Sequence, residues 1–255
     1  MTQWTALLLA GSRPGGDPFA AGYGTDLKPL IPLGGKSLVA WPVAALLAAP
    51  GVREVRVLTQ QVKRIAAALP DDARLRVEPS GTTIAATLAA ILADPGTRFP
   101  LLVTTADHVL LDPAMIADFC ARADGSDLAI GMVERGRLMA RLPGTKRTWL
   151  WFRGGAYSGA NLFAFGSAKA ASAVALWRSV EQDRKKGWRV LGSLGPLTLL
   201  GAVLRLRTID QVLAAVGARL GLAIRKVELA NPLAAVDVDT PADHDLVSAI
   251  LAGKA

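Results

Sequence analysis

The sequence WTALLLAGSRPGG, residues 4–16, contains an apolar run of strand length that ends at a glycine-rich loop. A strand of a parallel sheet reads as such a continuous apolar run, because helices cover both faces of its sheet. A glycine-rich loop at the end of the strand brings backbone N–H groups close to phosphate oxygens. The opening therefore predicts a parallel α/β sheet whose first loop, from Gly11 to Gly16, binds phosphate. An ordinary tight turn is the alternative for the loop taken by itself.

The segment DLKPLIPLGGK, residues 26–36, adds two lysines just beyond that loop. Lys28 and Lys36 lie among prolines and glycines, so we expect neither side chain to be buried. Each ammonium group can meet a phosphate as a point charge. The lysines therefore favour phosphate binding over a plain turn, and they indicate a site for a triphosphate.

Strands and helices alternate along the rest of the chain, which favours βαβ units and a mostly parallel sheet. We expect one domain over residues 1–255, a Rossmann-like α/β three-layer sandwich with a mostly parallel mixed sheet and a helical insertion at about 167–221. The expected strands are 4–10, 52–59, 75–78, 100–105, 128–133, 146–153, 159–165, 223–228 and 235–238. The expected helices are 37–49, 60–69, 83–93, 113–123, 167–184, 240–251 and a helical pair over 194–221.

The composition limits the class of protein. No apolar run reaches the ~20 residues of a membrane span, and we expect no signal peptide. The one cysteine, Cys120, excludes an internal disulfide framework, fits a cytoplasmic location and is expected to pack in the core.

The net charge of +8 is a clue to the kind of molecule that the protein binds. The basic residues are spread along the chain, and no zinc spacing, recognition helix or aromatic-basic sheet motif accompanies them. We therefore expect no nucleic-acid partner. A phosphorylated substrate or an anionic membrane surface accounts for the charge as well.

Asp107 follows the apolar run 101–106, which places its carboxylate at the carboxyl end of a buried strand. Mg²⁺ takes one or two protein carboxylates and completes its shell with phosphates and waters, so this position suits a metal ligand. A capping role in the following loop is the alternative. His108 beside it is expected to be a loop residue, because metal-assisted phosphoryl transfer can proceed without a general base.

The segment VDVDTPAD, residues 236–243, supplies further carboxylates. Alternation in a short strand places Asp237 and Asp239 on the same side, and either could be the second metal ligand. Thr240 is predicted to cap the last helix, and Asp243 to act as a cap or an ion-pair partner.

Three further groups are candidates for binding the two substrates. Ser80, Gly81 and Thr82 open the third predicted helix, where hydroxyl and N–H groups bind bases, sugars or phosphates, or only cap the helix. Asn161 is a candidate polar group in the pocket of an acceptor. Lys185 and Lys186 could hold an acceptor phosphate, although a basic helix end is usually solvated.

Taken together, the motifs LLAG at 8–11, KPLIPLGGK at 28–36, TAD at 105–107 and DVDTPAD at 237–243 resemble the MobA-like branch of the nucleotidyltransferases over essentially the whole chain. The resemblance implies the nucleotide-diphospho-sugar transferase fold, which GT-A glycosyltransferases share. It also implies transfer of a nucleoside monophosphate from an NTP to a phosphorylated acceptor, with release of pyrophosphate and with Mg²⁺ as cofactor.

The resemblance also implies roles for individual residues. Lys28, at the α-phosphate, and Asp107 would be catalytic, and the metal would lie on Asp107 with Asp237 or Asp239. Ala10, Gly11, Ser12 and Arg13 would hold the triphosphate, and Ser80, Gly81 and Thr82 the base or ribose. The usual loop reads Gly-x-Gly-x-Arg, whereas Arg13 comes only two residues after Gly11, so the chain departs from the family pattern at this position.

Further functions remain open from the sequence. A GT-A glycosyltransferase usually presents an Asp-x-Asp pair, whereas residues 106–109, ADHV, hold one aspartate. A non-catalytic nucleotide-binding protein or a basic nucleic-acid-binding protein would also fit the chain. The acceptor could be a sugar, polyol, cofactor-precursor or lipid-linked phosphate, and the apolar, basic stretch 188–222 leaves peripheral membrane association open.

Overall fold

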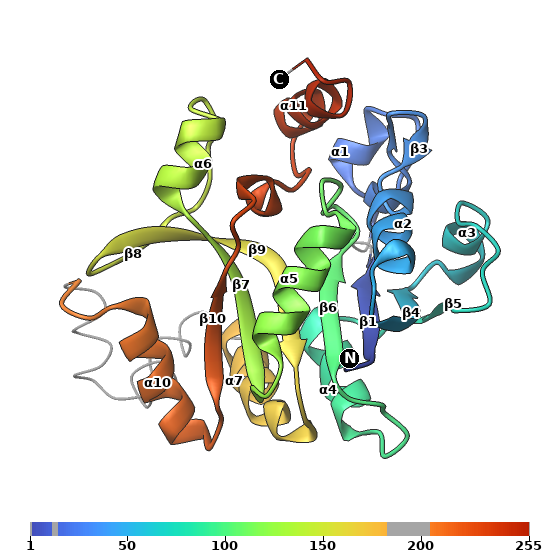
Figure 1. Ribbon diagram of the computed structural model, residues 1–255. Coiled ribbons are helices and arrows are strands. Elements are labelled where there is room, and N and C mark those ends of the chain that lie inside the picture. Colours follow the sequence, from blue (N-terminus) through green and yellow to red (C-terminus); the bar gives the residue numbers. More distant parts are fainter. Residues whose placement is uncertain (1, 12–14, 183–204, 255) are drawn as a thin grey trace.

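The computed structural model describes residues 2–11, 15–182 and 205–254, and a mixed sheet forms its centre (Figure 1). In this described part, eight strands form the sheet in the order β10-β7-β9-β6-β1-β4-β5, with β8 paired to β9. β5, β4, β1 and β6 run parallel, β9 is antiparallel to both β6 and β7, and β10 is parallel to β7. The strands are β1 (Trp4–Leu9), β4 (Val52–Thr59), β5 (Leu75–Pro79), β6 (Leu101–Thr105), β7 (Leu128–Glu134), β8 (Leu150–Phe152), β9 (Gly155–Phe165) and β10 (Ile224–Glu228), besides a hairpin of β2 (Pro32–Leu33) and β3 (Lys36–Ser37).

Helices cover both faces of the sheet, which makes three layers (Figure 1). Ala6 and Leu8 of β1 join the core under α2 and α5, whereas Leu7 joins the core under α4 and α7, because successive strand residues point to opposite faces. Burial on both faces explains why this strand reads as an apolar run. The helices are α1 (Pro18–Ala21), α2 (Ala40–Ala48), α3 (Val62–Ala66), α4 (Ile84–Ala93), α5 (Pro113–Ala123), α6 (Arg135–Arg141), α7 (Ala171–Gln182), α10 (Ile209–Leu220) and α11 (Pro241–Leu251), with short 3-10 helices η1 (Lys28–Leu30), η2 (Ala168–Ala170) and η3 (Pro232–Ala235).

This architecture confirms the predicted fold class and most of the predicted elements. The expected caps are present: the Asp112 carboxylate accepts from the Met115 N–H at the start of α5, and Thr240 forms a capping box with Asp243 at the start of α11. Cys120 is buried in α5 as expected, and burial raises the pKa of its thiol to about 12. Organisation as one domain stays a prediction.

The structure overturns the strand expected over 235–238. Pro232–Ala235 form the 3-10 helix η3, which starts at a proline and is capped by Asn231, whose side chain accepts from the Leu233 N–H. Residues 236–239 then run on without joining the sheet. Their apolar and acidic residues alternate as in a strand, but a contact with the loop that follows β6 holds them outside the sheet instead.

Two further predictions were wrong in extent, and two α-helices, the short α1 and α6, were missed. The strand expected over 146–153 is only β8, and the helix expected over 60–69 is only the five residues of α3 followed by turns. Helix α6 begins after Glu134, whose side chain caps it by accepting from the Arg137 N–H. Of the helical pair expected over 194–221, residues 194–204 lie outside the described residues and the rest contains α10. In the described ranges, no helix is long and apolar enough to cross a membrane.

Candidate functional site

A small pocket of about 140 Å³ lies at the carboxyl ends of β1 and β6. Gly11 follows β1, Asp107 follows β6, and Lys28 begins η1, and all three residues line the pocket. Ligands of open α/β sheets bind at such strand ends. Ile84, the first residue of α4, adds an apolar wall that is 39% exposed. Because ligand pockets usually exceed ~300 Å³, this pocket would hold only part of a nucleotide.

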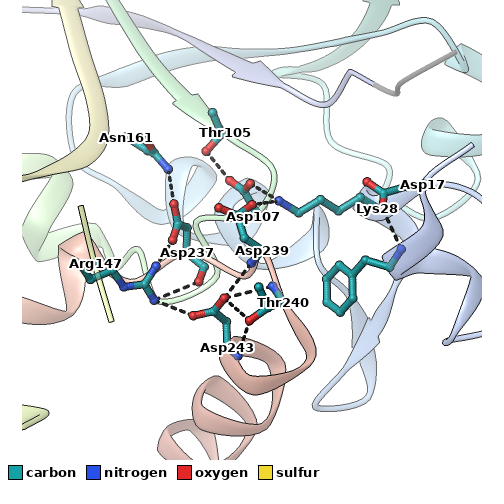
Figure 2. A network of polar contacts seen from close by, with 11 residues as sticks. Asp17, Lys28, Thr105, Asp107, Arg147, Asn161, Asp237, Asp239, Thr240 and Asp243 are labelled. Carbon is teal, nitrogen blue, oxygen red and sulfur yellow. Dashed lines mark hydrogen bonds and ion pairs between the residues drawn. The ribbon is translucent and has the colours of Figure 1, made fainter. Parts of the chain in front are cut away.

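The ammonium group of Lys28 joins two carboxylates beside this pocket (Figure 2). Its Nζ lies 2.5 Å from Asp107 Oδ2 and 2.5 Å from Asp239 Oδ1. Thr105 Oγ1 donates a hydrogen bond of 2.5 Å to the other oxygen of Asp107. Burial by itself would lower the pKa of Lys28, but the two carboxylates outweigh it and hold that pKa above its ordinary value. Lys28 is therefore charged at neutral pH.

The tail of the chain is held against the loop that follows β6. The Val238 N–H donates to the Asp107 carbonyl at 3.2 Å, and the Val238 side chain is fully buried in the core. This anchor brings the neighbouring residues Asp237 and Asp239 to the side of Asp107, as Figure 2 shows. The structure thus places all three predicted metal ligands in one region, although the segment that carries two of them is no strand.

Asp237 has different partners from Asp239. Its carboxylate pairs with the guanidinium of Arg147 and accepts a hydrogen bond of 3.1 Å from Asn161 Nδ2. Burial raises the pKa of Asp237, Arg147 opposes this shift, and the charges of Asp239 and Asp107 add to it. Arg147 and Asn161 thus bind both carboxylate oxygens of Asp237 and hold this side chain away from Lys28.

Asn161 reaches Asp237 from a backbone irregularity in β9. Its φ of 47° lies in the left-handed region, and the pairing of β9 with β7 changes register around it. Such bulges re-aim a side chain and often lie beside functional sites. Opposite it, Gly131 allows close packing, since a Cβ there would lie 3.0 Å from Leu162 Cβ. The sheet is therefore distorted at the residue that holds Asp237.

Arg147 is the main residue of this site that the sequence analysis missed. Its side chain is only 9% exposed, and besides Asp237 it pairs with Asp243 at 3.0 Å. It lies between α6 and β8, in residues that the strand prediction over 146–153 had assigned to the sheet. Asp243 is thus both the cap and the ion-pair partner that the sequence predicted. No local signal distinguishes Arg147 from the other basic residues.

The remaining predicted residues lie outside this cluster of aspartates or outside the described ranges. The Gly81 N–H donates to Thr87 Oγ1 at 3.0 Å and so is not free for a ligand, whereas Ser80 Oγ is buried without a hydrogen-bond partner among the described residues. His108 is fully buried beside Thr104, and burial lowers the pKa of its ring to about 4, which leaves it neutral. Lys36 is exposed, lies over the Trp41 ring and does not line the pocket. Ser12, Arg13, Lys185 and Lys186 lie outside the described residues.

Comparisons with known proteins agree with this fold. The family model described as MobA-like NTP transferase domain matches residues 7–219. A hypothetical transferase from Thermus thermophilus is similar in structure, with a TM-score of 0.79 and 26% identity, over 96% of this chain and 100% of that one. A 4-diphosphocytidyl-2C-methyl-D-erythritol synthase from Anaerococcus prevotii shares the fold, with a TM-score of 0.61 and 10% identity over 98% and 96% of the two chains.

A third structure, of CMP:2-keto-3-deoxy-manno-octonic acid synthetase with CTP, has a TM-score of 0.60 and 14% identity over 100% of both chains. No curated protein matches the sequence. The family match on this fold defines an α/β nucleotide-transferring protein. The chain belongs to the family of MobA-like NTP transferase domains, and it is a nucleotidyltransferase.

We predict that replacing Arg147 by Met destabilises the protein by about 3 kcal/mol at neutral pH, because Asp237 and Asp243 then lose their shared cation. Urea unfolding measures the loss. Arg64→Met is the matched control, since Arg64 forms an exposed pair with Asp26 and should cost less than about 1 kcal/mol.

The deficit of Arg147→Met should shrink as the pH falls from neutral into the acidic range. The pKa of Asp237 is already raised in the folded protein. As the pH falls, Asp237 of the folded variant is therefore protonated before Asp237 of the unfolded chain, and the neutral carboxyl needs no cation. The double variant R147M/D237N should recover part of the loss. A deficit no larger than that of the control, or one that does not change with pH, would contradict this role.

Proposed function

We propose that the protein is a Mg²⁺-dependent nucleotidyltransferase that moves a nucleoside monophosphate from an NTP to a phosphorylated acceptor and releases pyrophosphate. The observation that carries the proposal is the convergence of Asp107 and Asp239 on one cation, the ammonium of Lys28, beside the pocket at the end of β1. Family membership supports nucleotidyl transfer, and this geometry supports the metal.

The donor set fits Mg²⁺. Two carboxylate oxygens already face one positive charge, and Mg²⁺ takes one or two protein carboxylates with phosphates and waters as its other ligands. Among the described residues no group of three or more Asp, Glu, His or Cys side chains could hold a metal by itself, which agrees with a site completed by the substrate. We infer that Asp107 and Asp239 are the ligands, because the carboxylate of Asp237 is committed to Arg147 and Asn161. The bound metal would neutralise charge on the triphosphate.

The protein residues position the reactants. Lys28 would contact the α-phosphate, and Gly11 lets the backbone approach the triphosphate closely. An acceptor phosphate oxygen is a nucleophile at neutral pH, so no general base is required, and neutral, buried His108 is not one. Catalysis would come from alignment for in-line attack and from fixed positive charge.

The rest of the substrate assignment is part of the same proposal. Ser80, Thr82 and the apolar Ile84 lie at the start of α4, where they would contact the base and ribose. Asn161 would lie beside the acceptor, which we propose to be a sugar, polyol, cofactor-precursor or lipid-linked phosphate. Two similar structures carry cytidine nucleotides in their names, so CTP is the first NTP to test. A cytoplasmic location stays a prediction.

Lys28→Ala and Asp107→Asn should each lower turnover at least ~10²-fold, the usual effect of losing one preorganised charge contact. The assay is pyrophosphate release from each NTP with a set of phosphorylated acceptors. Asp118→Asn, at an exposed carboxylate on α5, is the control and should keep full activity. Near wild-type rates in both site variants would refute the assignment, and sugar transfer without pyrophosphate would indicate a glycosyltransferase.

Asp239→Asn should raise the Mg²⁺ concentration for half-maximal activity at least ~10-fold, since it weakens a direct ligand. Asp237→Asn should leave that concentration nearly unchanged, because Asp237 faces Arg147 and Asn161 instead of the metal. Pyrophosphate release measured against Mg²⁺ separates the two. If Asp237→Asn raises the required Mg²⁺ concentration more than Asp239→Asn does, Asp237 is the metal ligand instead of Asp239.

A further inference from the structure

The edge of the sheet at β8 exposes an unusual group of side chains, which we name the β8 patch. Its apolar members are Leu150, Trp151 and Leu206, with exposed fractions of 45%, 46% and 62%. Its basic members are Arg135, Arg153, Arg205 and Arg207. The Arg153 N–H donates to the Arg207 carbonyl at 2.9 Å, which joins the loop before α10 to the end of β8.

The basic and apolar members of the β8 patch are in contact. The guanidinium of Arg205 lies 5.0 Å from the centre of the Trp151 ring, and that of Arg135 lies 5.7 Å from it. Arg135 also lies 5.8 Å from the ring of Trp149. These distances are within the range of cation–π attraction. Around Trp151, positive charge therefore lies directly against a large apolar ring.

The positive charge of the β8 patch is uncompensated. Within the part of the chain that the structure describes, no carboxylate pairs with any of its four arginines. Some arginines elsewhere on the surface do have such partners: Arg56 pairs with Glu78 at 2.7 Å, Arg76 with Glu54 at 3.0 Å and Arg74 with Asp72 at 3.3 Å. Four arginines without a carboxylate partner among the described residues thus belong to the same patch as exposed apolar groups.

We propose that the β8 patch binds the surface of an anionic lipid membrane. Arginines attract lipid phosphates, a tryptophan ring suits the headgroup region, and leucines reach the boundary of the acyl chains. A nucleic acid would match the charge but gains nothing from exposed leucines, and the Trp151 ring that a base would stack on already has two guanidinium groups beside it. The proposal does not depend on the nucleotide site, since no residue of the patch lines that pocket.

The test is co-sedimentation of the full chain with vesicles of phosphatidylglycerol and phosphatidylcholine, and with vesicles of phosphatidylcholine alone. The protein should bind the anionic vesicles and be released by salt, because salt screens exposed charges. The double variant R153Q/R205Q should weaken binding at least about tenfold. Leu206→Ser, which changes an exposed loop side chain outside the sheet, should weaken it about fivefold.

The control is R74Q/R76Q, which removes the same charge from two arginines that have carboxylate partners, and it should change binding less than about twofold. Thermal unfolding checks that each variant is folded. Absence of sedimentation, equal binding to neutral vesicles, or an equal loss in the control would overturn the proposal. The proposal would also be overturned if vesicles do not bind and the same residues are needed instead for binding of labelled oligonucleotides. Self-association that depends on these residues, seen by analytical ultracentrifugation in the absence of vesicle binding, would have the same consequence.

Discussion

The site depends on one ammonium group that two carboxylates share. Lys28, Asp107 and Asp239 come from the start, the middle and the end of the chain, and they meet at contacts of 2.5 Å. Two carboxylates this close repel each other unless a cation lies between them. The raised pKa of Lys28 reflects the same interaction, with the carboxylates outweighing the burial that would lower it. The contact orders the end of β6 and the tail of the chain together.

The guanidinium group of Arg147 joins two other aspartates beside this site in the same way. Arg147 lies between Asp237 and Asp243 and ties the start of α11 to the loop before β8. Each pair of carboxylates thus has its own positive group, and their roles differ. Lys28 faces the pocket at the strand ends, where an incoming triphosphate would offer it a new anionic partner and leave two carboxylates for a metal. Arg147 is almost fully buried, which fits a fixed structural role.

The elements that could be predicted from sequence are those whose signals are local. Residues 52–59 and 113–123 have the predicted bounds, because a valine-rich segment of strand length and an Asp-Pro helix start mark them clearly. The place of Asp107 at a strand end follows from the apolar residues before it. The sequence offered either Asp237 or Asp239 as its partner at a metal, but no local pattern decides between two residues so far away in the chain.

The features that could not be predicted arise from tertiary structure. The residues VDVD at 236–239 alternate like a strand, yet η3 and the capping box of α11 hold them outside the sheet. The left-handed backbone of Asn161 follows from a register change between β7 and β9, which no single strand reveals. Arg147 lies where a strand was expected, and its importance appears only once Asp237 and Asp243 lie beside it.

The most direct measurement is a crystal structure of the protein with Mn²⁺ and a non-hydrolysable NTP analogue, with the metal located by anomalous scattering. The account predicts one metal peak bound by both Asp107 and Asp239, with Lys28 moved onto the phosphates. A metal bound at Asp237 in place of Arg147, or a nucleotide bound elsewhere while Lys28 still joins its two carboxylates, would contradict it.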